Sequence, residues 1–186
     1  MDSTRIKPFL AVTALTLLGA CAGSETEEAP AASAAVSSAA QPDTTGAAIW
    51  AHLQDANYQS NWGLWPGKGE LYAGNEPHGT LLTTYLNEIA MEALTSGATS
   101  MPPGAIVVKE NYMPDSTLAA VTVMYKSAGY DEEHNDWFFT KHLPSGELAQ
   151  MPNGMAMEGR LPGCQNCHGN VAANDYLFSG QLGAAQ

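Results

Sequence analysis

The sequence has little positive charge, which excludes one large class of function. It contains 7 lysine and arginine residues against 19 aspartate and glutamate residues, a formal net charge of −12. A protein with this charge repels nucleic-acid phosphates, and no basic stripe offsets the repulsion. We therefore expect no nucleic-acid partner.

A hydrophobic run long enough for a transmembrane helix is missing near the N-terminus. The apolar segment at residues 9–18 is too short to cross a bilayer. It follows Arg5 and Lys7 and has the length of the apolar part of a secretory signal peptide. We expect residues 1–20 to be a signal peptide and the protein to be exported.

The signal peptide ends in Leu18-Gly19-Ala20-Cys21, which resembles a bacterial lipobox. In a lipobox, the cysteine receives lipid and becomes the mature N-terminus. We predict a periplasmic protein held on the membrane by lipid on Cys21. The alternative is an ordinary cleaved signal peptide with a chance cysteine.

Cysteine is scarce, with three residues in the whole chain. Once Cys21 is assigned to lipid, only Cys164 and Cys167 remain, and a cofactor motif uses both. We expect no structural disulfide, so the exported domain must be held together by its core and its cofactor.

Large apolar side chains are almost absent from residues 21–46, which are mainly Ala, Ser, Glu, Pro and Thr. Such a segment cannot bury enough surface to offset the entropy of ordering it. We predict a flexible tether over 21–46, followed by one domain over 47–186.

Hydrophobic periodicity within the domain indicates an α+β fold. Helical spacing predicts a helix over 47–58, and a second short helix follows Asn87 as its N-cap and stops at Gly97. The predicted strands are 80–86, 105–112, 118–126 and 137–142. Turns separate the last three strands, and the residues at 114–115 and 144–146 are turn signals of the hairpin kind, so we expect an antiparallel sheet with flanking helices.

The strongest motif is Cys164-Gln165-Asn166-Cys167-His168, a C-x-x-C-H sequence. Its two thiols can each form a thioether with one haem vinyl group, and the adjacent histidine can bind the iron. A zinc site would need a fourth ligand, and a thioredoxin-like site would need a βαβ context. Export agrees with the motif, because c-type haem is attached outside the cytoplasm. We predict one covalent haem c on Cys164, Cys167 and His168.

The position of the motif bears on the sixth iron ligand. Only 18 residues follow His168, and none of them is Met, His or Lys. A sixth ligand from downstream is therefore excluded. The upstream candidates are Met113, Met124, Met151, Met155, Met157, His78 and His142. We expect the methionines to serve in packing, which leaves an iron with an open position for small molecules.

Several segments, in their order and spacing, resemble the cytochrome P-460 and cytochrome c′-beta family. They are Pro77-His78-Gly79, Tyr85-Leu86-Asn87, the stretches 103–110 and 121–126, Gly129-Tyr130, Asp136-Trp137-Phe138-Phe139, the C-x-x-C-H motif and 174–178. The resemblance implies a five-coordinate haem on an antiparallel sheet, in a homodimer. In the P-460 branch a lysine is cross-linked to the haem and hydroxylamine is oxidised. In the c′-beta branch there is no cross-link, and nitric oxide or carbon monoxide binds.

Lys109 falls at the position of the cross-linked lysine in this resemblance. Strand alternation places it on the same face as Val107, with Ile106 and Val108 on the other face. An inward, haem-facing lysine fits this pattern. The alternative is a solvated lysine that pairs with Glu110 or with an acid across the strands.

Four further features have both a structural and a functional interpretation. His78 could be a distal proton donor, but we favour a loop residue bonded to the backbone. The acidic turn at 131–134 could dock a basic redox partner, although we prefer a solvated loop. Trp137 and Phe139 share one strand face and Phe138 the other, so one set could cap the iron. Arg160 could pair with a haem propionate.

Three hypotheses for function follow. As an enzyme, the protein would oxidise hydroxylamine and pass electrons to a redox partner protein. As a binding module, it would capture nitric oxide. As an electron-transfer cytochrome, it would use a methionine from 151–157 as sixth ligand.

Overall fold

The computed structural model describes residues 41–178 and 182–183, within a compact unit formed by Ala39–Gln186. The predictions for the signal peptide, for Cys21 and for most of the tether therefore lie outside the described residues. Among the described helices, none combines the length and the apolar character that crossing a bilayer requires.

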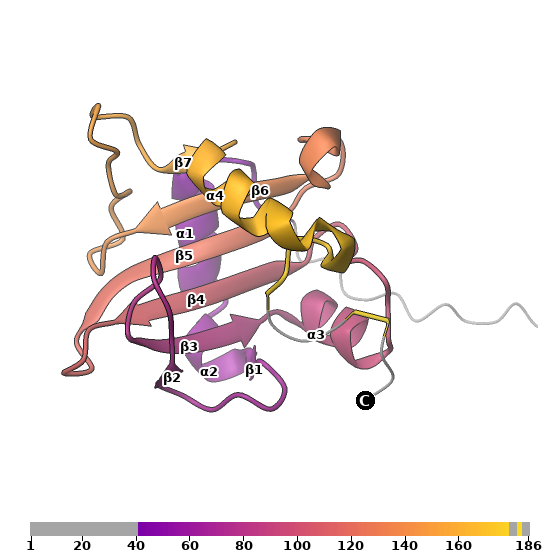
Figure 1. The fold of residues 1–186 in the computed structure, drawn as a ribbon, viewed down its shortest axis with the longest axis horizontal. Coiled ribbons are helices and arrows are strands. Elements are labelled where there is room, and N and C mark those ends of the chain that lie inside the picture. Colours follow the sequence, from indigo (N-terminus) through magenta and orange to yellow (C-terminus); the bar gives the residue numbers. More distant parts are fainter. Residues whose placement is uncertain (1–40, 179–181, 184–186) are drawn as a thin grey trace, which may run out of the picture. The chain divides into compact units, whose positions relative to one another are not determined.

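An antiparallel sheet forms the centre of this unit (Figure 1). Its strand order is β1-β3-β4-β5-β6-β7, and β2 also pairs with β3. The strands are β1 Gly63–Leu64, β2 Tyr72–Ala73, β3 Leu81–Leu86, β4 Ile106–Tyr112, β5 Leu118–Lys126, β6 Trp137–His142 and β7 Glu158–Gly159. This confirms the α+β class and the antiparallel sheet expected from the sequence.

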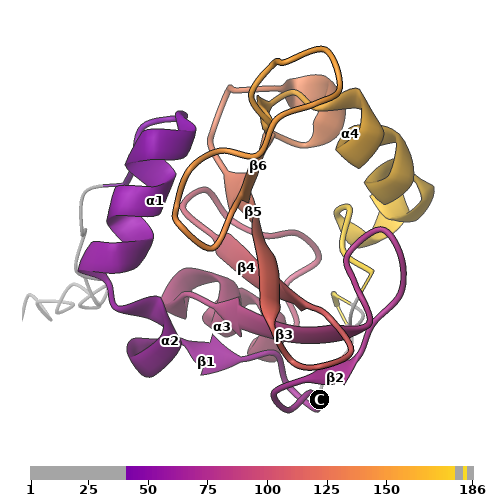
Figure 2. The same ribbon diagram turned by 90° about the vertical axis from the view of Figure 1, so that its left-hand side faces the viewer.

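Helices lie on both faces of the sheet. Helix α1 lies on one side and α4 on the other (Figure 2). The helices are α1 Gly46–Asp55, α2 Tyr58–Asn61, α3 Glu88–Thr95 and α4 Pro162–His168, with 3₁₀ turns at Glu132–His134 and Gly169–Asn174. We call the two sides of the sheet the α1 face and the α4 face.

Strand alternation divides the core between these faces. On the α1 face, Ile49 and Leu53 of α1 pack with Val108, Val123 and Phe138. The cluster on the α4 face contains Val107, Met124, Trp137, Phe139 and Leu161. The predicted separation of Trp137 and Phe139 from Phe138 is confirmed, as is that of Val107 from Ile106 and Val108.

The predicted helix over 47–58 is wrong at its C-terminal end. Helix α1 ends at Asp55, and Asn57 takes a left-handed conformation with φ of 45° before α2 begins. Asparagine tolerates this conformation better than most residues. The break turns Tyr58 into the core, where its hydroxyl donates to Glu110. The Asn87 cap is confirmed, since its side chain accepts from the Ala90 amide.

Candidate functional site

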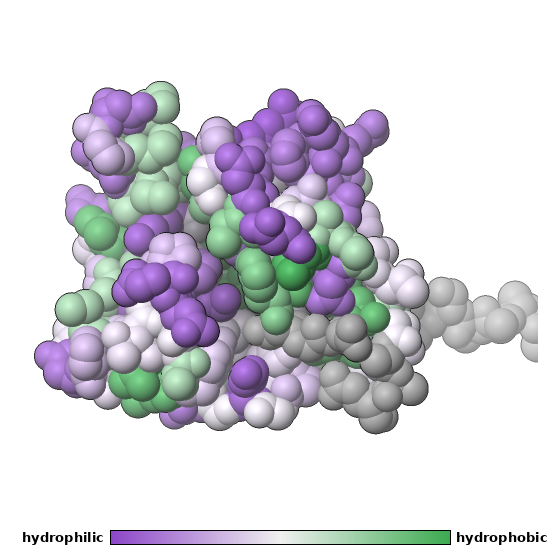
Figure 3. Space-filling view, viewed as in Figure 1, coloured by the Kyte–Doolittle hydropathy of each residue, from purple (hydrophilic) through white to green (hydrophobic). Residues whose placement is uncertain are grey.

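A cavity of about 350 Å³ lies between the sheet and α4. Its walls come from the α4 face of the sheet, from the loop before β3, from α4 and from residues 177–178. On the surface that carries α4, hydrophobic residues gather beside this helix and hydrophilic residues border them (Figure 3). The cavity therefore has a largely apolar setting into which a few polar side chains project.

The three motif residues line this one cavity. Helix α4 begins at Pro162, a residue suited to the first turn because it has no amide hydrogen to leave unpaired. Positions i, i+3 and i+4 share one side of a helix, so Cys164, Cys167 and His168 project together. Both thiols are free. Burial raises the pKa of the Cys164 thiol, and Lys141 opposes this shift.

His168 has a fixed tautomer. Its Nδ1 lies 2.7 Å from the Tyr176 carbonyl oxygen, which can only accept, so Nδ1 carries the hydrogen. Burial lowers the pKa of His168, while the hydrogen bond to Tyr176 opposes this shift. The lone pair of a neutral imidazole is then on Nε2, which makes no hydrogen bond within the described residues. This is the state in which histidine binds a metal.

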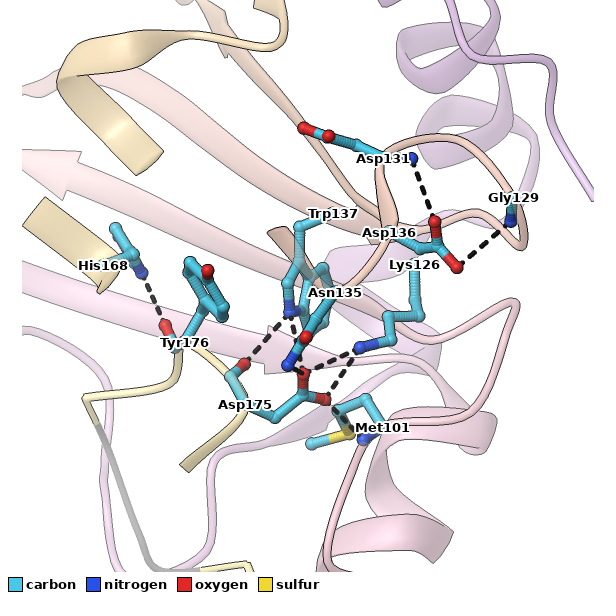
Figure 4. A network of polar contacts seen from close by, with 10 residues as sticks. All are labelled: Met101, Lys126, Gly129, Asp131, Asn135, Asp136, Trp137, His168, Asp175 and Tyr176. Atoms are coloured by element: carbon cyan, nitrogen blue, oxygen red, sulfur yellow. Dashed lines mark hydrogen bonds and ion pairs between the residues drawn. The ribbon is translucent and has the colours of Figure 1, made fainter. Parts of the chain in front are cut away.

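A buried network holds the carbonyl that orients His168 (Figure 4). The neighbouring Asp175 accepts from Lys126 Nζ at 2.7 Å and from the Met101 amide at 2.7 Å. Trp137 Nε1 donates to the Asp175 carbonyl at 3.0 Å, and Asn135 donates to its carboxylate at 3.0 Å. The side chain of Asp175 is 2 % exposed. No local sequence pattern predicts this network, because its members lie far apart along the chain.

Lys109 also lines the cavity. It lies opposite Thr84 and Thr122 in the sheet, and no hydrogen bond or ion pair of its ammonium group is present among the described residues. Burial lowers the pKa of Lys109. Glu110 points to the α1 face and accepts from Tyr58 and Tyr112 there, so a solvated Lys109 paired with Glu110 is not what the structure contains.

His78 differs from the interpretation favoured at the sequence level, in which it bonds the backbone of its loop. Its Nδ1 lies 3.1 Å from Asn111 Oδ1 and 3.4 Å from Thr122 Oγ1, both side-chain atoms. The ring lines the cavity, with its centroid 6.1 Å from that of His168. Burial first, and Lys109 second, lower the pKa of His78 to about 4.

The candidate sixth ligands differ in whether they line the cavity. Met124, Met151, Met157 and His78 line the cavity. Met113 and Met155 are 53 % and 56 % exposed, and neither lines it. His142 is buried elsewhere, with Thr140 and the Gly146 carbonyl as hydrogen-bond partners and Trp50 as an aromatic neighbour.

Arg160 lies outside the cavity wall. Its guanidinium donates to the Tyr130 carbonyl, stacks over the Tyr130 ring and lies 3.6 Å from Asp131. Asp131 in turn accepts from Gln165 of α4 at 2.7 Å, which ties the acidic turn to this helix. Glu132 and Glu133 are exposed, as expected for a solvated turn.

The cavity contains cations and no acid among its described lining residues. Lys141 lines it together with Lys109, while no aspartate or glutamate does. The sequence analysis did not single out Lys141, although period-two alternation places it on the same face as Phe139. The same rule places Asn111 on the face of Lys109.

Two comparisons with known proteins bear on this site. The family model described as Cytochrome P460 matches residues 50–179, which include every cavity residue named above. A search of curated proteins finds no match.

Proposed function

The chain belongs to the cytochrome P460 family, and from this premise we propose that it is an exported protein whose single covalent haem binds small nitrogen species. The family is one of haem proteins. The observation that carries the proposal is the joint placement of Cys164, Cys167, His168 and Lys109 around one cavity. Hydroxylamine and nitric oxide are the ligands we propose.

The residues around the cavity fit a haem. Two free thiols and one histidine with an unbonded Nε2 face the same space. Apolar side chains such as Val107, Phe139 and Leu177 suit a porphyrin ring, and two lysines without an acid suit a group that carries carboxylates. Within the described residues, no set of three or more His, Cys, Asp or Glu side chains is arranged to hold a bare metal ion.

Each motif residue has a definite role in this proposal. The thiols of Cys164 and Cys167 would each add across one vinyl double bond, so that sulfur bonds to one carbon, the thiol hydrogen goes to the other, and no oxidant is needed. His168 would hold the iron through Nε2, because the Tyr176 carbonyl keeps the ring oriented and makes Nε2 a better donor. When bound, the haem supplies a redox-active iron that takes a small ligand.

The cavity walls would control what reaches the iron. Phe139 and Met124 would present apolar surface to the bound group from the α4 face of the sheet. Lys109 would present a donor side chain beside which no acid lines the cavity in the described part of the chain, which favours electron-rich ligands. The predicted pairing of Arg160 with a propionate remains part of the proposal, although its guanidinium contacts Tyr130 and Asp131 here.

Hydroxylamine oxidation is the second candidate function, and the unpaired Lys109 favours it. In this reaction hydroxylamine would be oxidised, a redox partner protein would be reduced, and each electron removed would leave with one proton. Periplasmic export, a lipid anchor on Cys21 and a homodimer complete the proposal.

The test uses the full chain, purified with its haem. The proposal expects spectral changes when either hydroxylamine or nitric oxide is added. A red-shifted ferrous Soret band, with Lys109 recovered joined to the haem peptide by mass spectrometry, would support the oxidising enzyme. An unshifted spectrum with nitric oxide binding would support the binding module. A spectrum that neither ligand changes would contradict both.

A further inference from the structure

The backbone is unusual at the two residues that follow the 3₁₀ turn Gly169–Asn174. Asp175 has a φ of 51° and Tyr176 a φ of 66°, so both are left-handed and neither is glycine. One left-handed residue is an ordinary way to end a helical turn. A second one, with a side chain as bulky as tyrosine, is not needed for that purpose and costs free energy. Residues 175–176 are therefore a strained segment, and their surroundings must hold it.

The side chain of Asp175 anchors this segment (Figure 4). It is 2 % exposed, and its carboxylate accepts from Lys126 Nζ at 2.7 Å, the Met101 amide at 2.7 Å and Asn135 at 3.0 Å. Trp137 Nε1 donates to the Asp175 carbonyl at 3.0 Å. The donors come from the loop before β4, from the end of β5 and from residues around the start of β6. Three separate segments of the fold thus fix one residue.

The strained segment determines the direction of the Tyr176 carbonyl. This oxygen lies 2.7 Å from His168 Nδ1, eight residues earlier in the chain. A carbonyl points where the backbone dihedral angles around it direct it. The left-handed backbone of Tyr176 and the anchored Asp175 therefore act on the same hydrogen bond. Strained backbone that its surroundings hold in place concentrates at functional sites, and here it supports the histidine of the C-x-x-C-H motif.

The hydrogen bond on Nδ1 affects how strongly Nε2 donates to a metal. A histidine whose Nδ1 hydrogen is held by an acceptor is a stronger donor through Nε2. A stronger donor stabilises the oxidised state of an iron more than the reduced state, so it lowers the reduction potential. An enzyme that oxidises hydroxylamine needs an oxidised electron acceptor at rest, and a low reduction potential favours that state.

We propose that Asp175 is a positioning residue, which fixes the Tyr176 carbonyl on His168 Nδ1 through the left-handed backbone and thereby lowers the reduction potential of the haem. The inference rests on the proposed function, because it assumes a haem held by the C-x-x-C-H motif. It gives the buried ion pair of Asp175 a purpose besides stability. It agrees with a five-coordinate iron, since it acts only on the His168 side.

Resonance Raman spectroscopy and redox titration of the full-length haem protein test this inference. In ferrous Asp175→Ala we expect a lower iron–histidine stretching frequency than in wild type, because the hydrogen bond on Nδ1 is loosened. At one fixed applied potential, the ratio of ferrous to ferric protein should be about tenfold higher in Asp175→Ala, which corresponds to about 59 mV for one electron. Asp175→Asn should change both quantities less, since asparagine tolerates the left-handed backbone and keeps one acceptor oxygen.

Two further variants separate positioning from stability. Glu110→Gln also changes a buried carboxylate, but on the α1 face, and should leave the stretching frequency and the reduction potential unchanged. Asn135→Gly removes one donor to Asp175 from an exposed residue, and glycine suits the φ of 53° at this position. Asn135→Gly should fold as the wild type does, which circular dichroism checks. We expect it to shift both quantities in the same direction as Asp175→Ala, by a smaller amount.

Distinct results would overturn the inference and the proposed function. Wild-type stretching frequency and reduction potential in the folded Asp175 variants and in Asn135→Gly would overturn the positioning role. So would an equal shift in Glu110→Gln, because it would reflect loss of stability alone. If Asp175→Ala does not fold, Asp175→Asn and Asn135→Gly decide. Failure of the wild type to bind nitric oxide or hydroxylamine would instead overturn the proposed function, whatever the variants do to the potential.

Discussion

The two faces of β4 treat a charged side chain in opposite ways. Lys109 and Glu110 are neighbours, and alternation sends them to opposite sides of the sheet. On the α1 face, the Glu110 carboxyl is fully buried and accepts from Tyr58 at 2.7 Å, Gln59 at 2.5 Å and Tyr112 at 2.5 Å. On the α4 face, Lys109 has no such partner among the described residues.

This contrast distinguishes a face of the sheet that stabilises the fold from a face that can bind a group. A buried charge that every neighbour satisfies stabilises one packing arrangement, whereas a buried charge left unpaired costs free energy unless something else enters the space. The α1 face is therefore complete by itself, and the α4 face is built to receive a group. The predictions below test this division, from the largest expected effect to the smallest.

Removing the two thiols should have the largest effect and should be confined to the α4 face. We expect Cys164→Ser with Cys167→Ser to abolish covalent haem, because no other thiol lines the cavity in the part of the chain that the structure describes. Haem staining on a denaturing gel measures this. Cys21→Ser is the matched control, and it should keep haem while losing the lipid. Retained haem staining in the double variant would contradict the proposed attachment.

Breaking the ion pair between Lys126 and Asp175 should have the second-largest effect. Asp175→Asn leaves the Lys126 ammonium buried without a carboxylate, which typically costs about 3–5 kcal/mol. Denaturant unfolding measures this loss. Asp55→Asn, on the exposed side of α1, is the matched control and should stay within about 0.5 kcal/mol of wild type. An equal loss of stability in both variants would show that the buried ion pair of Asp175 does not account for the effect.

Glu110→Gln tests the α1 face, where the buried carboxylate has hydrogen-bond partners. It replaces a carboxylate oxygen by an amide group that cannot accept from both tyrosines, so we expect a loss of about 2 kcal/mol in the free energy of unfolding. Glu92→Gln, on the exposed side of α3, should change it little. The haem spectrum should not change in either variant. A spectral change in Glu110→Gln would mean that the two faces are coupled.

Lys109→Met should differ from Glu110→Gln in both respects. It should have a small effect on stability and a visible effect on the site. Removing a half-buried cation that has no partner among the described residues should leave the free energy of unfolding within about 1 kcal/mol of wild type or raise it. Lys141→Met removes the other cavity lysine and is the matched control. If Lys109 is bonded to the haem, only Lys109→Met should change the mass of the haem peptide.

A loss of several kcal/mol in Lys109→Met would contradict the comparison. It would mean that Lys109 has a structural partner equivalent to those of Glu110. A partner of that kind would have to come from the bound haem itself, and removal of the haem would then abolish the loss.

Much of this division followed from local sequence patterns. Period-two alternation placed Lys109 with Val107 and separated Phe138 from Phe139, because a strand has only two faces. The C-x-x-C-H motif is local, so it identified three residues of α4 that line the cavity. The Asp175 network and the anchoring of His78 by Asn111 could not be predicted, since each joins segments distant in sequence. The break at Asn57 was missed because helical periodicity continues through it.

The smallest expected effect is a loss of stability at alkaline pH that comes from tyrosines on the α1 face. Burial, with Glu110 as the next cause, raises the pKa of Tyr85 to about 12, and burial raises the pKa values of Tyr58 and Tyr112 as well. An unfolded tyrosine ionises near pH 10, about two units lower than folded Tyr85, so above pH ~10 the folded state binds more protons than the unfolded state. The stability that these tyrosines contribute is complete below that pH and is lost as the pH rises towards 12.

Tyr85→Phe should make the decline in stability less steep, as measured by denaturant unfolding at successive pH values. Tyrosinate absorbance that develops near pH 10 while the haem spectrum and circular dichroism stay native would show that the α1 face is not closed. Absorbance that develops only with unfolding would show that the α1 face resists ionisation because its tyrosines are buried.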